Sequence, residues 1–131
     1  MNEQNTDGQK TVELSDELSE STLAFWQNRI ATTPFLRLLG IELGTLARGA
    51  CTLTMAIKPE HLQQDGFVHA GVQATLADHA CGTAAATCMG PKEGVLSIEF
   101  KLNLLKPARG ERISAVARVI RAGRCAPFCT H

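Results

Sequence analysis

Residues 70–88 read AGVQATLADHACGTAAATC and constrain the fold more than any other part of the chain. Val72, Leu76, Ala80 and Ala84 recur every four residues, which is the spacing of one face of an α-helix. Nearly all side chains here are small, and each interior glycine costs about 1 kcal/mol relative to alanine. Helical propensity therefore does not explain this composition. We expect a helix against which other backbone packs very closely, as it would if a sheet wrapped around it.

Two pairs of strand-like segments flank this helix. Before it, residues 41–44 and 51–57 alternate between apolar and polar side chains on either side of an Arg-Gly dipeptide, which is typical of an antiparallel hairpin. After it, the alternating segments 97–104 and 113–120 are separated by the turn KPARG. The order of helix, two strands, central helix and two strands predicts an α+β fold.

The N-terminal part differs in character from this region. Residues 1–12 are polar, and we expect them to form a disordered leader. A helix capped by Ser15 is predicted to run to about Ile30, where the following Thr-Thr-Pro sequence ends it. We therefore divide the chain into a leader with its helix, residues 1–33, and a main domain, residues 34–131.

Composition narrows the class of protein. Hydrophobic residues make up 44% of the chain, which is ordinary for a globular protein and argues against disorder. The 13 basic and 13 acidic residues cancel, so nothing indicates a nucleic-acid partner. No apolar run is long enough to span a membrane, and the polar, acidic N-terminus resembles neither a signal peptide nor a transit peptide. We expect a cytoplasmic protein.

The five cysteines are an odd number without an export signal, which favours reduced thiols over disulfides. Cys125 and Cys129 form a C-x3-C pair close to His131. Three such residues at a chain end are only a weak sign of zinc, and we expect no metal site.

Asp78 is the main candidate for chemistry. It lies within the small, apolar helix, where an ionised carboxylate is costly unless it is paired or hydrogen-bonded. One interpretation is structural, with Asp78 facing solvent or forming an ion pair at a subunit contact. The other is that Asp78 acts as a general base or nucleophile in a cleft.

The start of the helix supplies a second candidate group. The amides near Ala70 and Gly71 are among the unsatisfied donors of a helix N-terminus, and such donors suit a developing oxyanion. Ala70 and Asp78 are eight residues apart, which is about 12 Å along a helix. One chain cannot place both groups on the same carbonyl carbon. If both act, they come from different subunits, and the active unit is at least a dimer.

The stretches HLQQDGFVHAGVQATLADHACGTAA and SIEFKLNLLKPARGERISAVARVIRAGR resemble the hotdog-fold acyl-CoA thioesterases of the phenylacetate-degradation (PaaI-like) type. The resemblance runs from about Pro34 to Arg124, and its most specific parts are the HAGVQATLAD block and the LKPARGE turn. It implies a long helix wrapped by an antiparallel sheet and assembly into homodimers or homotetramers. It also implies hydrolysis of acyl-CoA thioesters, which needs no metal or redox cofactor.

The resemblance also implies roles for individual residues. Asp78 matches the family's catalytic acid, which activates water or attacks the thioester directly. Ala70 matches a glycine whose N–H polarises the thioester carbonyl across the dimer, and alanine keeps that N–H. Gln63 stands where many members carry an asparagine that contacts the carbonyl. Ser97 matches a serine that helps to hold the nucleophilic water.

Other residues are assigned to substrate binding. His69 and Gly71 flank Ala70, with His69 ordering the loop beside the site. Arg121 and Arg124 are candidates for the phosphates of coenzyme A, although exposed arginines at a strand end are often only solvated.

Two other functions stay open. One is a non-catalytic acyl-CoA-binding protein of the same fold, and the other is a 3-hydroxyacyl dehydratase in which His69 is the base. The C-terminal sequence CAPFCTH lacks the length and alternation of the two further strands usual in the family. We therefore expect an incomplete, shortened sheet.

Overall fold

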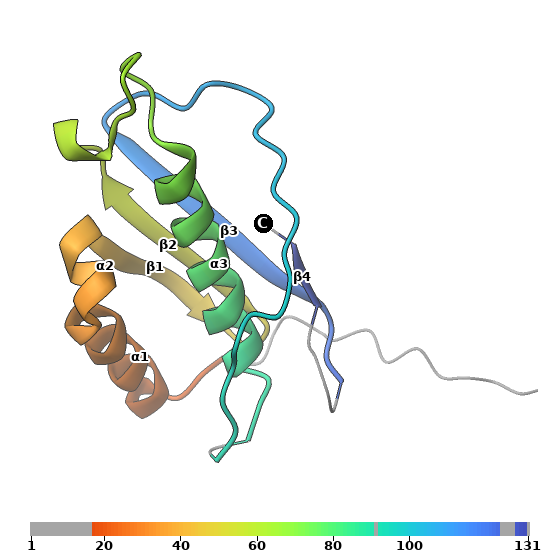
Figure 1. Ribbon diagram of the computed structural model, residues 1–131. Helices are drawn as coiled ribbons and strands as arrows, with labels where there is room; N and C mark the ends of the chain where they lie inside the picture. The colour runs from red at the N-terminus through yellow and green to blue at the C-terminus, as the bar shows by residue number, and fades with distance from the viewer. Residues whose placement is uncertain (1–16, 91, 124–127, 131) are drawn as a thin grey trace, which may run out of the picture.

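A computed structural model describes residues 17–90, 92–123 and 128–130 of the chain. In chain order its elements are α1 (Glu20–Thr32), α2 (Pro34–Leu39), β1 (Ile41–Ala47), β2 (Ala50–Ala56), the 3₁₀ turn η1 (Pro59–His61), α3 (Ala70–Ala86), β3 (Arg112–Arg121) and β4 (Phe128–Thr130). The strands form one antiparallel sheet in the order β1-β2-β3-β4. The long helix α3 lies across one face of this sheet, with α1 and α2 on the β1 side (Figure 1). The predicted α+β hotdog arrangement is confirmed.

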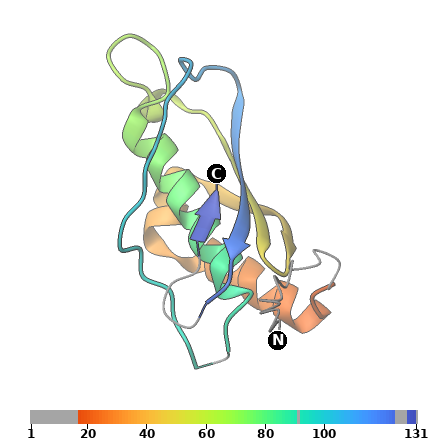
Figure 2. The same cartoon turned by 90° about the vertical axis from the view of Figure 1, so that its right-hand side faces the viewer.

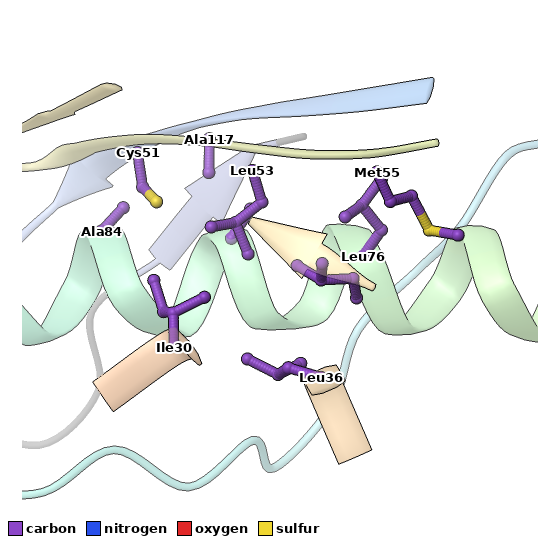
Figure 3. Close-up of a cluster of buried hydrophobic side chains, with 10 residues drawn as sticks. Ile30, Leu36, Cys51, Leu53, Met55, Leu76, Ala84 and Ala117 are labelled. Atoms are coloured by element: carbon purple, nitrogen blue, oxygen red, sulfur yellow. The ribbon is translucent and has the colours of Figure 1, made fainter. Parts of the chain in front are cut away.

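The core lies between α3 and the sheet. Along β2, Cys51, Leu53 and Met55 are buried, and the threonines between them are only partly covered. On α3, Ala80 and Ala84 are fully buried beneath the strands. Figure 3 shows this cluster with its labelled members Ile30, Leu36, Cys51, Leu53, Met55, Leu76, Ala84 and Ala117. The small side chains of α3 therefore serve the close helix–sheet packing that the sequence predicted.

The hairpin and the central helix match their predicted positions. The β1–β2 turn lies at Arg48-Gly49, where Gly49 has a φ of 73°, and its N–H donates to the Thr87 hydroxyl at 2.7 Å. This bond ties the turn to the end of α3. One irregularity was not predicted: the register between β1 and β2 shifts between Leu43 and Thr45.

The N-terminal helix begins later than predicted. Residues 17–19 are not helical, and the cap is Ser19, whose hydroxyl accepts a hydrogen bond from the Thr22 amide at 3.3 Å. Ser15 is therefore wrong as the cap. The proline that ends α1 also begins α2, a helix of six residues that is too short for its apolar period to be read from the sequence. The expected disordered leader, 1–12, lies outside the described residues.

The predicted strand at 97–104 is wrong. Residues 92–111, which we term the connecting segment, contain neither helix nor strand. Figures 1 and 2 both show this segment running beside α3 instead of along a sheet edge. Alternation alone does not make a strand, because a strand also needs a neighbour to accept its backbone hydrogen bonds. Leu96, Ile98 and Leu105 remain 91%, 86% and 88% exposed.

The C-terminal region holds more structure than its sequence predicted. β4, only three residues long, pairs antiparallel with β3. Three residues are too few to show the alternation by which a strand is recognised. Within the described ranges, no helix is long and apolar enough to cross a membrane.

Candidate active site

Asp78 and Ser97 meet beside the middle of α3. Asp78 is half-buried, and its Oδ1 accepts a hydrogen bond from the Ser97 hydroxyl at 2.5 Å. Ser97 belongs to the connecting segment, so two parts of the chain that are 19 residues apart form this pair. Asp78 is only partly buried, so the residue is not closed off from water.

The N-terminus of α3 leaves one particular amide free. Of the four first-turn amides, that of Gly71 donates to His69 Nδ1 at 2.9 Å. Those of Val72 and Gln73 donate to the His69 carbonyl at 3.0 and 3.2 Å. Among the described residues nothing accepts a hydrogen bond from the Ala70 N–H. The amide that the resemblance assigned to the carbonyl, that of Ala70, is thus the first-turn donor without an acceptor among the described residues.

His69 acts within the chain as the N-cap of α3. Histidine is not among the preferred N-cap residues, so this role was not predicted. The cap uses the ring nitrogen Nδ1 and takes up the Gly71 amide. Both residues were predicted to bind substrate, and within the chain they hydrogen-bond to each other.

The loop before α3 is held by its own hydrogen bonds. His61 is 1% exposed, and its Nδ1 accepts from the Lys58 amide at 3.1 Å. The Gln63 side chain bonds to Asp65, with Oε1 accepting from the Asp65 amide and Nε2 lying 3.5 Å from Oδ2. Gln63 would have to leave Asp65 before its amide could reach a substrate.

Of the two predicted phosphate-binding arginines, only Arg121 lies within the described residues. Arg121 is exposed at the last residue of β3. That end of β3 lies near the C-terminal end of α3, since the Val119 amide donates to Gly49 O and the Gly49 amide to Thr87. Arg124 and the side chains of the C-x3-C pair lie outside the described residues. Within the described part of the chain, no group of three potential ligands could hold a metal ion.

Two other titratable groups, Cys51 and His79, lie against or on α3. Burial raises the pKa of the Cys51 thiol to about 12, against a weaker lowering by the Thr83 hydroxyl, so the thiol is protonated at neutral pH. Burial lowers the pKa of His79, and the Arg29 charge lowers it further, while Asp78 acts in the opposite direction. His79 is therefore neutral at pH 7.

This geometry suits the addition of water to a carbonyl group. A partly exposed carboxylate can accept a proton from water, and the adjacent hydroxyl can hold that water or the carboxylate in position. A free amide at a helix N-terminus stabilises a developing oxyanion. Sequence analysis identified the carboxylate, the serine and the amide, but it did not predict the contacts that hold the serine in place.

Known proteins that are similar to this chain include thioesterases. The Thioesterase superfamily model matches residues 65–125. Acyl-coenzyme A thioesterase 13 of Homo sapiens is 32% identical over 96 residues, covering 72% of this chain and 68% of that protein. The 1,4-dihydroxy-2-naphthoyl-CoA hydrolase of Listeria monocytogenes is 29% identical over 86 residues, covering 66% of this chain and 70% of that protein.

A solved structure extends the likeness to three dimensions. The crystal structure of a thioesterase family protein from Silicibacter pomeroyi aligns with a TM-score of 0.72 and 41% identity. The alignment covers 74% of this chain and 71% of that protein. Fold, identity and coverage agree with the resemblance read from the sequence. The chain belongs to the thioesterase superfamily, and it is a thioester hydrolase with the hotdog fold.

Proposed function

We propose that the protein hydrolyses acyl-CoA thioesters to the free acid and coenzyme A, with Asp78 as the catalytic carboxylate. The observation that carries this proposal is the hydrogen bond from Ser97 to a half-buried Asp78. The acyl-CoA substrate is supported by the two relatives, which are named for hydrolysis of CoA thioesters.

In the proposed reaction, water adds to the thioester carbonyl carbon while Asp78 takes one of its protons. The carbonyl oxygen becomes an oxyanion held by a backbone N–H. The intermediate then collapses with cleavage of the C–S bond, and the coenzyme A sulfur receives the proton from Asp78. A second route has Asp78 attack the carbonyl carbon itself, so that the C–S bond breaks and a mixed anhydride and the coenzyme A thiolate form. Water then hydrolyses the anhydride to the free acid and the Asp78 carboxylate, and the proton released goes to the thiolate.

We propose that the oxyanion donor is the Ala70 amide of a second copy. Along α3, the Ala70 amide and Asp78 of one chain are separated by about 12 Å, whereas both must lie about 3 Å from the reacting carbonyl. The connecting segment beside Asp78 carries the exposed apolar side chains Leu96 and Ile98, a surface that a second subunit would cover. The active unit is then a dimer with two equivalent sites.

The experiment is a substrate panel with the purified protein. Aryl-CoA and fatty-acyl-CoA thioesters are supplied separately, and thiol release is followed with a thiol-reactive dye against a protein-only blank. We expect turnover of at least one member, with free acid formed in equal amount. Binding of the thioesters without thiol release would overturn hydrolysis in favour of a binding protein. Loss of water from a 3-hydroxyacyl-CoA without thiol release would favour the dehydratase.

A further inference from the structure

Ser97 is held in an unusual way. Within the described residues, no backbone–backbone hydrogen bond joins residues 94–107 to another element. The connecting segment is fastened only near its ends, where the Glu93 amide donates to Gly90 O at 3.0 Å and the Val68 amide to Ala108 O at 2.9 Å. The position of Ser97 relative to α3 therefore depends on side-chain contacts.

One such contact lies next to the Asp78–Ser97 pair. A Cβ atom placed on Gly82 would lie 3.8 Å from Val95 Cγ1, with no other atom outside the local backbone within 4 Å. Asp78 and Gly82 are one turn apart on α3 and share a face. Val95 and Ser97 are two residues apart, and both approach α3, Ser97 at Asp78 and Val95 beside Gly82. The Ser97–Asp78 hydrogen bond and the approach of Val95 to Gly82 therefore lie next to each other along α3.

Gly82 needs an explanation other than backbone conformation. It lies within α3 and is not among the glycines with positive φ. A helix-interior glycine costs about 1 kcal/mol relative to alanine. An alanine Cβ at 3.8 Å would make ordinary contact with Val95. A longer side chain that extends toward Val95 would crowd it, so a small residue at position 82 suits the approach of Val95 to α3.

We propose that Gly82 and Val95 are positioning residues that set the distance of Ser97 from Asp78. The small residue at position 82 lets Val95 lie close to α3, and this approach holds Ser97 at the carboxylate. The inference rests on the proposed function, because the distance matters only if Asp78 and Ser97 act on the substrate.

The test varies the size of the side chains at positions 82 and 95. Gly82→Ala is expected to keep kcat within about threefold of wild type, since its methyl group fits. Gly82→Leu is expected to lower kcat by about tenfold to 100-fold with KM changed less than threefold, because a shift of about 1 Å at a reacting group can cost that much. Val95→Ala should restore most of the loss in the Gly82→Leu protein by making room for the leucine.

A double-mutant cycle separates positioning from a general effect on the fold. In a Ser97→Ala background, Gly82→Leu is expected to cause little further loss of kcat, because the group it displaces is already absent. An equal loss in both backgrounds, or wild-type kcat in Gly82→Leu, would overturn the inference. If circular dichroism shows that Gly82→Leu does not fold, Val95→Phe replaces it, because the larger ring crowds the same space from the connecting segment. We then expect Val95→Phe to lower kcat with little change in KM, and to cause little further loss of kcat in the Ser97→Ala background.

Asp78→Asn is measured alongside these size variants. If this variant keeps wild-type turnover, the proposed function fails and the positioning role fails with it. If Asp78→Asn is inactive while the size variants have no effect, only the positioning inference is wrong.

Discussion

Replacing Asp78 by asparagine is expected to lower kcat for acyl-CoA hydrolysis by about 100- to 10,000-fold, the range contributed by a positioned acid or base. Asparagine has nearly the same shape and can still accept a hydrogen bond from Ser97, but it cannot take a proton from water. KM for the thioester should change little, since the substrate contacts stay in place. Steady-state thiol release gives both constants.

Glu99→Gln is the matched control for this prediction. Glu99 is an exposed carboxylate two residues beyond Ser97, and its neutralisation changes the charge of the same region by the same amount. Its kcat is expected to stay within about twofold of wild type, as is usual for surface substitutions away from a site. Comparable losses in both variants would mean that general electrostatics, not a specific carboxylate, supports the reaction.

Replacing Ala70 by proline is expected to lower kcat by about 100- to 1,000-fold, the cost of removing one oxyanion donor. The change deletes the backbone N–H and little else. Ala70 is the first residue of α3, where proline is well tolerated. The preceding His69 has φ −57° and ψ 138°, a conformation that a following proline favours. Turnover with saturating substrate provides the measurement.

Ala70→Gly is the matched control, because it removes the side chain and keeps the N–H. Its turnover is expected to remain within about threefold of wild type. Thermal unfolding of both variants should lie close to that of the wild type. Wild-type turnover in Ala70→Pro would show that the carbonyl oxygen is held by another donor.

Local pattern predicted the elements whose partners are close in sequence or whose composition is distinctive. The small-residue helix and the hairpin around Gly49 are of this kind, since turn chemistry and periodicity specify them. The segment 97–104 has the same alternation and no strand, because a strand depends on a neighbour that its own sequence does not encode. The cap at Ser19 was missed for a similar reason, since two serines at the helix start compete and only local geometry selects one.

The residues of the candidate site likewise divide into those that the sequence predicted and those that it did not. Asp78 stands out in the sequence because a carboxylate is costly inside an apolar helix. Ala70 was assigned as the oxyanion donor through the resemblance, whereas the uptake of the Gly71 amide by the His69 ring was not predicted. The approach of Val95 to Gly82 could not be predicted, because nothing in the sequence indicates that the connecting segment lies against α3.

The central claim is that one reaction site draws Asp78 from one subunit and the Ala70 amide from the other. Co-expression of Asp78→Asn and Ala70→Pro chains with different affinity tags allows the mixed dimer to be purified. In a two-fold dimer, one of its sites then combines an intact Asp78 with an intact Ala70 amide, and the other carries both changes. Each parent homodimer has no intact site.

The measurement is kcat per mixed dimer, compared with a wild-type dimer that carries the same two tags. The shared site predicts about half of the wild-type turnover, far above either parent, because one of two equivalent sites is restored. Turnover no higher than that of the parent homodimers would contradict the claim. In that case no chain of the mixed dimer holds both groups, and the carboxylate and the amide would have to act within a single subunit.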